Sequence, residues 1–501
     1  MKRNFARLET VARRSVWTFA VLALAGLLLP ASAQQVRQLS DSGASHLWWD
    51  PYLAADGHAI VARENSSGVE GDGLDLVYFT TDGSIERPIG FFSTWFVDHP
   101  NLSADGQTIF FLSAGDPTGD TGCLFVPRIH RIDIDGNLQS LSVVGPEPFF
   151  CGCPQDQLHM AAQTDEAVFL GCPPSGDQVQ RIELTPETLH PVLGTTGGGA
   201  QEPRISGDAE WVVNWATFQD TGGNPGGVSL MRADGSNFTN LDLAGSEPDL
   251  SDDGRYVAWE SGADLLGQNG DNSREIYLYD RVNATTTQLT DFAAGLGENR
   301  MPRVSGNGEW IHFLSDIPIF GIAPTGPSTT DSFGYRVHRE TLNIEMVFAH
   351  HVVFGTGTRD PNEYEVGFSG DQVAYVSQGD PTGENPDGGR EVFFVDLSVP
   401  STFEVGADDP TVLSWSLDPR APTWDVIRGD IAELADGGGA TVSLGNVTCL
   451  ADDLADLSTS DPLQPSPGQG FFYLRRGAAG SYGTSSGGAS RAAIAGDCNP
   501  S

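Results

Sequence analysis

The sequence has almost no lysine, since Lys2 is the only one among 501 residues. A lysine Schiff base or a lysine general base is therefore excluded once the first residues are removed. Basic side chains are few overall, with 27 lysines and arginines against 67 aspartates and glutamates. Nucleic acids and anionic membranes are bound by clustered cations, so neither is an expected partner. The acidity fits high solubility, or a surface that recruits cations or basic partners.

Long apolar runs are also missing, except near the start of the chain. Five basic residues at the N-terminus precede an apolar run from Val16 to Leu29, and small residues follow at 31–33. This order is typical of a secretory signal, so residues 1–33 are expected to be removed during export to the periplasm or the cell exterior. The mature chain then carries 22 basic and 66 acidic residues, a formal net charge of −44. No later segment is predicted to span a membrane.

Cysteine is scarce, and the six cysteines suit an oxidising compartment. Cys449 and Cys498 stand alone in the last hundred residues and are expected to form a disulfide. The other four lie closer together in the sequence: Cys123, Cys151, Cys153 and Cys172. A bond within Cys-x-Cys would be strained, so Cys151 and Cys153 are each expected to pair with one of the other two, in either order. Zinc binding is the rival interpretation, although this spacing fits it poorly.

What the chain does contain is a repeated segment. Residues 100–106, 203–208, 248–254 and 302–308 each carry Pro-x-[Leu/Ile/Val]-Ser followed by a turn with Asp or Asn. Seven repeats start near Pro51, Pro100, Leu158, Pro203, Pro248, Pro302 and Asn362. A period of this length, with a strand on each side of a tight turn, is typical of the blades of a β-propeller. We therefore predict an all-β protein with a β-propeller over residues 34–399, in which seven blades are favoured and six or eight are alternatives.

One strand of this pattern has no blade of its own. The segment 36–40 matches 287–290, which is predicted to be the outer strand of a blade. An N-terminal outer strand can complete the last blade and close the ring, which removes open sheet edges. We expect that closure here.

The repeats resemble the WD40-like, or TolB-like, propeller repeats of bacterial envelope proteins. The resemblance covers roughly residues 36–399 and depends on the Pro-x-[Leu/Ile/Val]-Ser-x-[Asp/Asn]-Gly element and on a following Tyr-Asp pair, as at Tyr279 and Asp280. It implies the fold, whereas proteins with such rings differ widely in function. Residues 400–501 leave the period, and their order of Trp415, Asp425 to Gly429 and Gly470 to Leu474 is similar to fibronectin type III-like domains, which implies a small β-sandwich.

Polar loops between the second and third strands of several blades are expected to gather on one rim of the ring. Their candidate metal ligands are Asp116, Asp120, Asp264, Asn269, Asp271, Asp380, Asn385 and Asp387. Calcium prefers such oxygen ligands, so calcium is the candidate cofactor and no other is expected. The alternative is that these residues only form turns.

Side chains next to the blade starts are expected to face a central channel and to make it negative. These candidate ligand-binding residues are Asp98, His99, Glu202, Glu247 and Asp360. No catalytic residue is assigned, because the serine that recurs in the repeats is expected to bond the backbone of its turn. The leading hypothesis is an exported, monomeric, non-catalytic scaffold whose acidic face recognises a protein, peptide or glycan. The alternatives are a propeller enzyme that uses paired channel carboxylates on carbohydrate and a calcium-stabilised adhesion protein.

Overall fold

The protein is described here by a computed structural model. It describes residues 36–41, 47–65, 74–92, 97–103, 105–113, 128–140, 156–171, 178–184, 187–192, 200–216, 226–293, 297–317, 319, 333–348, 364–379, 382, 384–399, 403–406, 410–415, 424–436, 441–454, 458–466, 469–477, 490–492 and 497–498. The chain divides into two compact units. One comprises Gln35–Pro400 with Leu417–Arg420, and the other includes Ser401–Ser416 and Ala421–Ser501.

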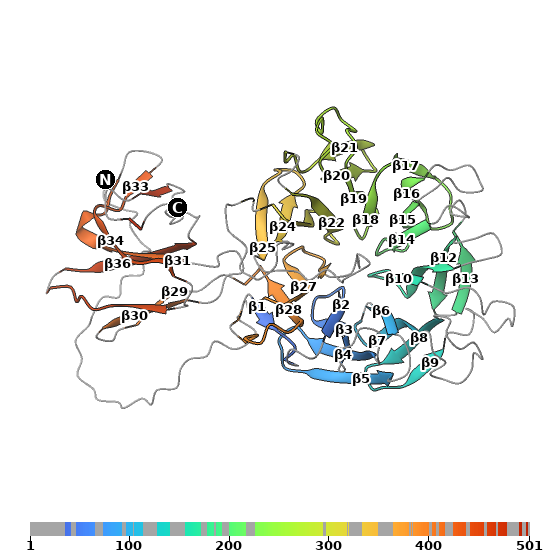
Figure 1. The fold of residues 1–501 in the computed structure, drawn as a ribbon, viewed down its shortest axis with the longest axis horizontal. Coiled ribbons are helices and arrows are strands. Elements are labelled where there is room, and N and C mark those ends of the chain that lie inside the picture. Colours follow the sequence, from blue (N-terminus) through green and yellow to red (C-terminus); the bar gives the residue numbers. More distant parts are fainter. Residues whose placement is uncertain are drawn as a thin grey trace, which may run out of the picture. The chain divides into compact units, whose positions relative to one another are not determined.

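The described part of the first unit forms seven four-stranded antiparallel sheets arranged around a common centre (Figure 1). In six of these sheets the four strands follow one another in the chain. The first two sheets are β2 (Leu47–Leu53), β3 (Ala59–Asn65), β4 (Leu74–Thr80), β5 (Glu86–Phe92), and β6 (Val97–Leu102), β7 (Thr108–Ser113), β8 (Arg128–Asp133), β9 (Leu138–Ser140). The next two are β10 (Asp156–Met160), β11 (Glu166–Gly171), β12 (Gln178–Leu184), β13 (Glu187–Pro191), and β14 (Ala200–Ile205), β15 (Trp211–Ala216), β16 (Gly227–Arg232), β17 (Thr239–Asp242). The fifth and sixth are β18 (Ser246–Leu250), β19 (Tyr256–Ser261), β20 (Glu275–Asp280), β21 (Thr285–Gln288), and β22 (Asn299–Val304), β23 (Trp310–Ser315), β24 (Phe333–His338), β25 (Ile344–Phe348).

The seventh sheet joins the two ends of the ring. It consists of β26 (Tyr364–Val366), β27 (Gln372–Ser377) and β28 (Glu391–Asp396), with β1 (Val36–Gln38) as its outer strand. Val36 pairs with Val395 and Gln38 with Phe393, in antiparallel register. The prediction that the N-terminal strand completes the last blade is confirmed.

Side chains from neighbouring sheets pack into shared hydrophobic clusters. Ile276 of the fifth sheet packs in one cluster with Phe313 and Tyr335 of the sixth, and all three are fully buried. Trp48 of the first sheet shares another cluster with Phe394 of the seventh. Burial of apolar area contributes about 25 cal/mol per Å², and here it depends on the adjacent sheet. Each sheet is therefore stabilised by its neighbours in the ring.

The recurring serine fixes the turn between the first two strands of a blade. Ser251 Oγ donates a hydrogen bond to Asp253 Oδ1 at 2.7 Å and accepts one from the Tyr256 amide at 3.1 Å. Gly254 follows with a φ of 60°, a conformation that glycine adopts at little cost. The same pair of bonds recurs at Ser206 and Ser305. The serine thus shapes the turn, and the expected role of this residue is confirmed.

The second unit is built from three three-stranded sheets in its described part. The first has β29 (Phe403–Val405), β30 (Thr411–Trp415) and β35 (Ser458–Asp461); the second has β34 (Val447–Leu454), β31 (Trp424–Asp430) and β36 (Phe471–Gly477); the third has β32 (Ala435–Asp436), β33 (Thr441–Ser443) and β37 (Ser490–Ala492). A single 3-10 turn, η3 (Ile431–Glu433), follows β31. Arg428 binds Asp461 at 2.8 Å and joins the first two sheets. A fibronectin type III-like arrangement of these sheets stays a prediction.

Within the described ranges, no helix has both the length and the apolar character needed to cross a membrane.

Candidate functional site

A β-bulge recurs in the innermost strand of six blades. The pairing between the first and second strands shifts by one residue just before the Pro or Leu that starts the repeat. In each case the residue at this point has a positive φ: Asp50 (47°), His99 (47°), Gln157 (54°), Glu202 (48°), Glu247 (53°) and Met301 (51°). Non-glycine residues rarely adopt this conformation, and a bulge redirects the side chains that follow it.

The second residue after each bulge faces the centre of the ring. Together with the equivalent residue of the seventh blade, these positions form the channel ring, which we define as Tyr52, Asn101, His159, Arg204, Asp249, Arg303 and Glu365. Arg204 Nη1 lies 3.9 Å from Glu365 Oε2, although the two come from blades that are not adjacent. The channel ring contains two arginines as well as two carboxylates. It consists of the residues two positions after the bulges, whereas most of the candidate residues selected from the sequence lie at the bulges or next to them.

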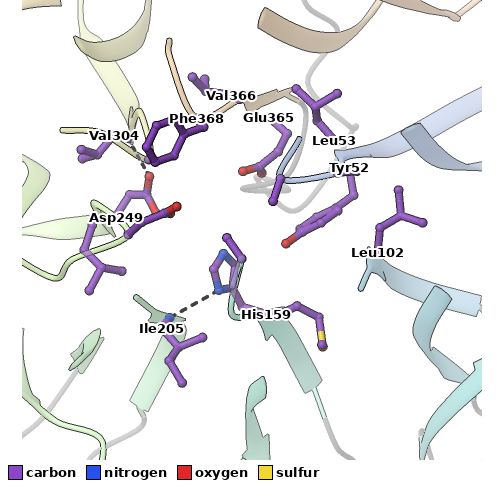
Figure 2. A pocket seen from close by; sticks show the side chains of 18 residues that line it. Tyr52, Leu53, Leu102, His159, Ile205, Asp249, Val304, Glu365, Val366 and Phe368 are labelled. Atoms are coloured by element: carbon purple, nitrogen blue, oxygen red, sulfur yellow. Dashed lines mark hydrogen bonds between the residues drawn. The ribbon is translucent and has the colours of Figure 1, made fainter. Parts of the chain in front are cut away.

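Several channel-ring side chains are held by the next blade. Asn101 Oδ1 accepts a hydrogen bond from the Met160 amide at 3.1 Å. His159 Nδ1 accepts one from the Ile205 amide at 3.3 Å, and Asp249 Oδ2 accepts one from the Val304 amide at 2.7 Å (Figure 2). Because the donors are backbone amides of the neighbouring inner strand, these side chains are fixed before any ligand arrives.

The electrostatics of the channel ring follow from burial beside fixed arginines. Burial lowers the pKa of His159 well below its ordinary value, and Arg204 and Arg303 lower it further. The imidazole is therefore neutral, and because Nδ1 accepts a bond, the proton is on Nε2. Burial raises the pKa of the Glu365 carboxyl, while the same two arginines oppose that rise. Burial disfavours the charge on Arg303, but Asp249 and other acidic neighbours raise its pKa overall.

A cavity of about 60 Å³ opens where the channel meets the turns between the first and second strands (Figure 2). We call this end the channel mouth. Four channel-ring residues line it, namely Tyr52, His159, Asp249 and Glu365, and so do Asp252 and Phe368 from the turns. The mouth is opposite to the rim that carries the loops between second and third strands, because antiparallel strands place these connections at opposite ends.

Backbone hydrogen bonds between neighbouring blades hold the turns of the mouth in place. The Asp252 amide donates to the Gly306 carbonyl at 3.0 Å, and the Asn307 amide donates to the Phe368 carbonyl at 2.9 Å. The Asp208 amide in turn donates to the Asp252 carbonyl at 3.0 Å. Three inter-blade contacts thus connect four successive turns into one rigid rim segment.

The sequence-predicted carboxylates Glu202 and Glu247 do come together, but away from this cavity. Their carboxyl groups interact with one another, and Trp215 Nε1 donates to Glu202 Oε2 at 2.8 Å. Burial raises the pKa of both, and that of Glu247 is raised further by Glu202 and Glu260. The raised pKa of both carboxyls favours a proton held between them.

The other predicted ligand-binding residues have structural partners or lie outside the described part. Asp98 Oδ1 is 3.1 Å from Arg63 Nη1 and 3.3 Å from His99 Nδ1. Burial opposes the charge on Asp98, but Arg63 and His99 lower the pKa of this carboxyl well below its ordinary value. Asp360 lies outside the described residues.

The predicted calcium ligands that the structure describes bond within their own loops. Asp264 Oδ1 accepts from the Asn269 amide at 2.9 Å, and Asn269 Nδ2 donates to the Ser273 carbonyl at 2.8 Å. Asp271 Oδ1 accepts from Ser273 Oγ at 2.9 Å. In the loop before β28, the Asn385 and Asp387 side chains bond to backbone groups of residues 379 and 389. Asp116, Asp120 and Asp380 lie outside the described residues, and calcium binding stays a prediction.

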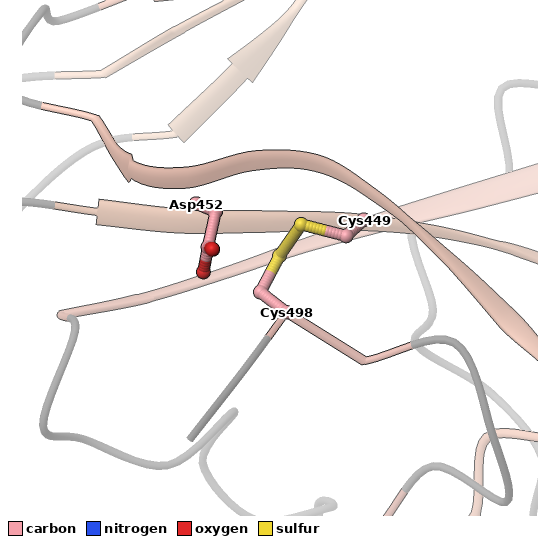
Figure 3. A group of neighbouring side chains, drawn as sticks. All are labelled: Cys449, Asp452 and Cys498. Atoms are coloured by element: carbon pink, nitrogen blue, oxygen red, sulfur yellow. A yellow bond between two sulfur atoms is a disulfide. The ribbon is translucent and has the colours of Figure 1, made fainter. Parts of the chain in front are cut away.

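The described cysteines form a disulfide rather than a metal centre. Cys449 and Cys498 are joined by a disulfide, with Asp452 beside them (Figure 3). These three residues are the one group of candidate metal ligands that the described ranges bring together, and bonded sulfurs are not thiolate ligands. The other four cysteines, Cys123, Cys151, Cys153 and Cys172, lie outside the described residues.

Most of the channel ring was missed by sequence reasoning, although a signal was present. The ring position is the x of Pro-x-[Leu/Ile/Val]-Ser, where a polar residue precedes an apolar one in every repeat. In contrast to its neighbours, this position changes from blade to blade. A position that varies among otherwise similar repeats is not needed for the blade itself, which marks it as a candidate functional position.

No protein-family model matches the sequence, and no curated protein matches it either. Some solved structures, in contrast, are similar to this chain. An oligogalacturonate lyase in complex with manganese is similar with a TM-score of 0.51 and 13% identity, over 73% of this chain and 94% of that one. The β-propeller domain of the Trilobed protease from Pyrococcus furiosus gives a TM-score of 0.45 and 12% identity, over 70% of this chain and 95% of that one. TolB from Acinetobacter baumannii gives a TM-score of 0.36 and 13% identity, over 54% of this chain and 58% of that one.

The first of these likenesses and the ring of four-stranded sheets define the class of the protein. It is an all-β protein with a β-propeller. At 13% identity the likeness extends to the fold alone.

Proposed function

We propose that this protein is an exported binding scaffold whose channel mouth recognises a protein, peptide or glycan. The observation that carries the proposal is the channel ring, a set of varied polar side chains on an otherwise repeated framework. Serine, Asp-Gly turns and apolar strands recur because each blade needs them. Tyr52, His159, Asp249 and Glu365 replace one another at equivalent positions and line a cavity. Variation of this kind supports recognition of an asymmetric ligand.

Binding is favoured over carbohydrate hydrolysis by the state of the paired carboxylates. Glu202 and Glu247 interact with each other and do not line the cavity at the channel mouth. His159 is fixed by the Ile205 amide and is neutral, so one of its nitrogens is already occupied. Of the acids of the mouth, Asp249 and Asp252 belong to the fifth blade and Glu365 to the seventh, and Arg204 holds Glu365 in an ion pair at 3.9 Å.

Export to the bacterial envelope is part of the proposal. The expected secretory signal at residues 1–33 and the disulfide between Cys449 and Cys498 support an oxidising compartment. The resemblance of the repeats to TolB-like propellers points to the same location. The acidic composition supports a partner with basic groups.

Site-specific photo-crosslinking tests the proposal. A benzophenone amino acid is placed at Phe368 on the mouth and, as a matched control, at Val282, an exposed residue of a turn in the fifth blade. With the envelope fraction of the source organism, position 368 is expected to label a defined partner and position 282 to give only background. A glycan array covers the glycan alternative. Two outcomes would contradict the proposal. One is labelling at position 282 but not at position 368, together with no glycan bound. The other is turnover of the bound ligand.

A further inference from the structure

The charges around the channel mouth are unevenly compensated. Its lining includes three carboxylates, Asp249, Asp252 and Glu365, and no lysine or arginine is among the described residues that line it. The two arginines of the channel ring compensate two of these, since Arg204 lies 3.9 Å from Glu365 and Arg303 interacts with Asp249. Asp252 is the third carboxylate. The groups that shift its pKa most include no cation.

Asp252 is surrounded by acids. Burial raises the pKa of its carboxyl, and Asp249, Asp208 and Asp253 raise it further. The partner that opposes this rise is a neutral amide, Gln163 Nε2, which donates to Asp252 Oδ2 at 3.2 Å. A cation placed at the mouth would relieve this repulsion, so the site gains from a positive ligand.

An exposed aromatic ring lies close to this carboxylate. Phe368 is 52% exposed, which is unusual for a large apolar side chain, and it lies on the turn after β26. Gly306 separates the two: a Cβ at this position would be 2.6 Å from Phe368 Cδ2 and 2.9 Å from Asp252 Oδ2. An aromatic face beside a carboxylate attracts a cation from two sides.

The mouth has room for a small cationic head group. A volume of about 60 Å³ holds a few water molecules, at roughly 10–15 Å³ each, and therefore admits an ammonium or guanidinium head. Leu53, Ile205 and Val304 also line the cavity and provide apolar contact for an aliphatic stem. Among the described residues, the three carboxylates of the mouth do not form a group of oxygens within 4.8 Å of one another, as a divalent ion would need.

From these contacts we infer that the channel mouth receives the cationic end of a lysine or arginine side chain from a polypeptide partner, next to Asp252 and Phe368. The inference rests on the proposed binding function and specifies its ligand. A polypeptide is the source because the cavity buries only a side-chain head, while the surrounding turns of the blades offer a surface for the rest of the segment.

The probes are fluorescent decapeptides of glycine and serine with one central residue: lysine, arginine, acetyl-lysine or norleucine. Binding to the full-length protein is measured by fluorescence anisotropy at low and high salt. Lysine and arginine peptides are expected to bind at least about fivefold more tightly than the two uncharged ones, and the difference should shrink with salt.

Three variants and a control locate the binding. Asp252→Asn and Phe368→Ala are each expected to weaken the lysine peptide about five- to tenfold. Gly306→Ala keeps the charge but places a methyl group between the two side chains, so it should weaken binding as well. Asp234→Asn removes one charge at an exposed turn away from the mouth and should change the affinity less than twofold.

The outcomes separate this inference from the proposed function. Equal binding of lysine and norleucine peptides, or equal weakening by Asp234→Asn and Asp252→Asn, would overturn the inference. If a partner still crosslinks at position 368 in that case, the proposed function stands without a basic side chain in the mouth. Competition by micromolar calcium or manganese chloride would instead identify a metal site and would also overturn the inference. Absence of any crosslinked partner or glycan would count against the function itself.

Discussion

Arg204 and Glu365 form an ion pair across the central channel, with 3.9 Å between Arg204 Nη1 and Glu365 Oε2. Arg204 belongs to β14 and Glu365 to β26, strands of blades separated by at least two others. The Arg204 side chain is 6% exposed and that of Glu365 is 16% exposed. This contact connects opposite sides of the ring where no backbone hydrogen bond can.

Breaking this pair from one side should destabilise the ring. Arg204→Met leaves the buried Glu365 carboxylate with less compensation, and removal of one partner of a buried pair costs roughly 3 kcal/mol. The double variant Arg204→Met/Glu365→Gln removes both charges and is expected to recover most of that loss. Chemical denaturation of the four proteins in the cycle gives the coupling energy. A double variant as unstable as the sum of the single variants would show that the two charges act independently.

The shared proton of Glu202 and Glu247 predicts a pH-dependent stability. The pKa of Glu247 is raised above its ordinary 4.5 in the folded protein, by burial and then by Glu202 and Glu260, while Arg303 opposes this rise. Its favourable contribution is therefore complete below about pH 4.5 and is lost as the pH rises through the raised pKa. Glu247→Gln removes this dependence, so the variant should gain stability relative to the parent as the pH rises above 4.5.

Urea denaturation at several pH values measures this difference. Glu309→Gln changes an exposed glutamate of the sixth blade and serves as the matched control. Parallel stability curves for the parent and Glu247→Gln across this pH range would rule out a shared proton. A flat curve for Glu309→Gln relative to the parent is expected.

The period of the sequence predicts the blades because each local feature has one function in every copy. The serine of the turn bonds its own loop, as Ser251 does with Asp253, so the motif and the turn correspond directly. The same logic predicts the closing strand, because 36–40 repeats the residue types of 287–290. The β-bulge is different, since its residues vary in type and only backbone pairing reveals it. Without the bulge, the sequence does not indicate that Arg303, two residues after Met301, belongs to the channel ring.

Site prediction was weaker for the same physical reason. Glu202 and Glu247 were expected to face the channel, and the structure brings them together, apart from the cavity at the mouth. Asp252 was hidden among the many aspartates of the turns. It is distinguished by contacts with other blades, to Gln163 and around Gly306, and such contacts have no signature in one repeat.

Ring closure by β1 predicts a large effect of the N-terminal segment on stability. Ser40 Oγ donates to Glu391 and accepts from the Val392 amide at 2.8 Å, and Thr290 makes the same bonds to Glu275 and Ile276 within the fifth blade. Ser40→Ala and Thr290→Ala should therefore cost similar amounts, about 1–3 kcal/mol, because each removes one hydrogen bond to a buried carboxylate and one from a backbone amide.

Deletion of residues 34–41 should cost much more than Ser40→Ala. It also removes the buried Val36 and Leu39, each worth about 1.5–3 kcal/mol, and exposes the edge of β28. Thermal unfolding followed by circular dichroism compares the deletion with the two single variants. An unchanged melting temperature for the deletion would show that the ring does not depend on this strand.

The disulfide between Cys449 and Cys498 predicts how reduction affects the second unit. It closes a loop of 49 residues, for which the loss of chain entropy in the unfolded state corresponds to about 4 kcal/mol. Dithiothreitol is therefore expected to lower the melting temperature of the parent. The double variant Cys449→Ser/Cys498→Ser should already melt at a lower temperature, and any further shift with dithiothreitol reports the remaining cysteines alone. The difference between the two shifts isolates this bond, and equal shifts in both proteins would mean that the bond contributes no stability.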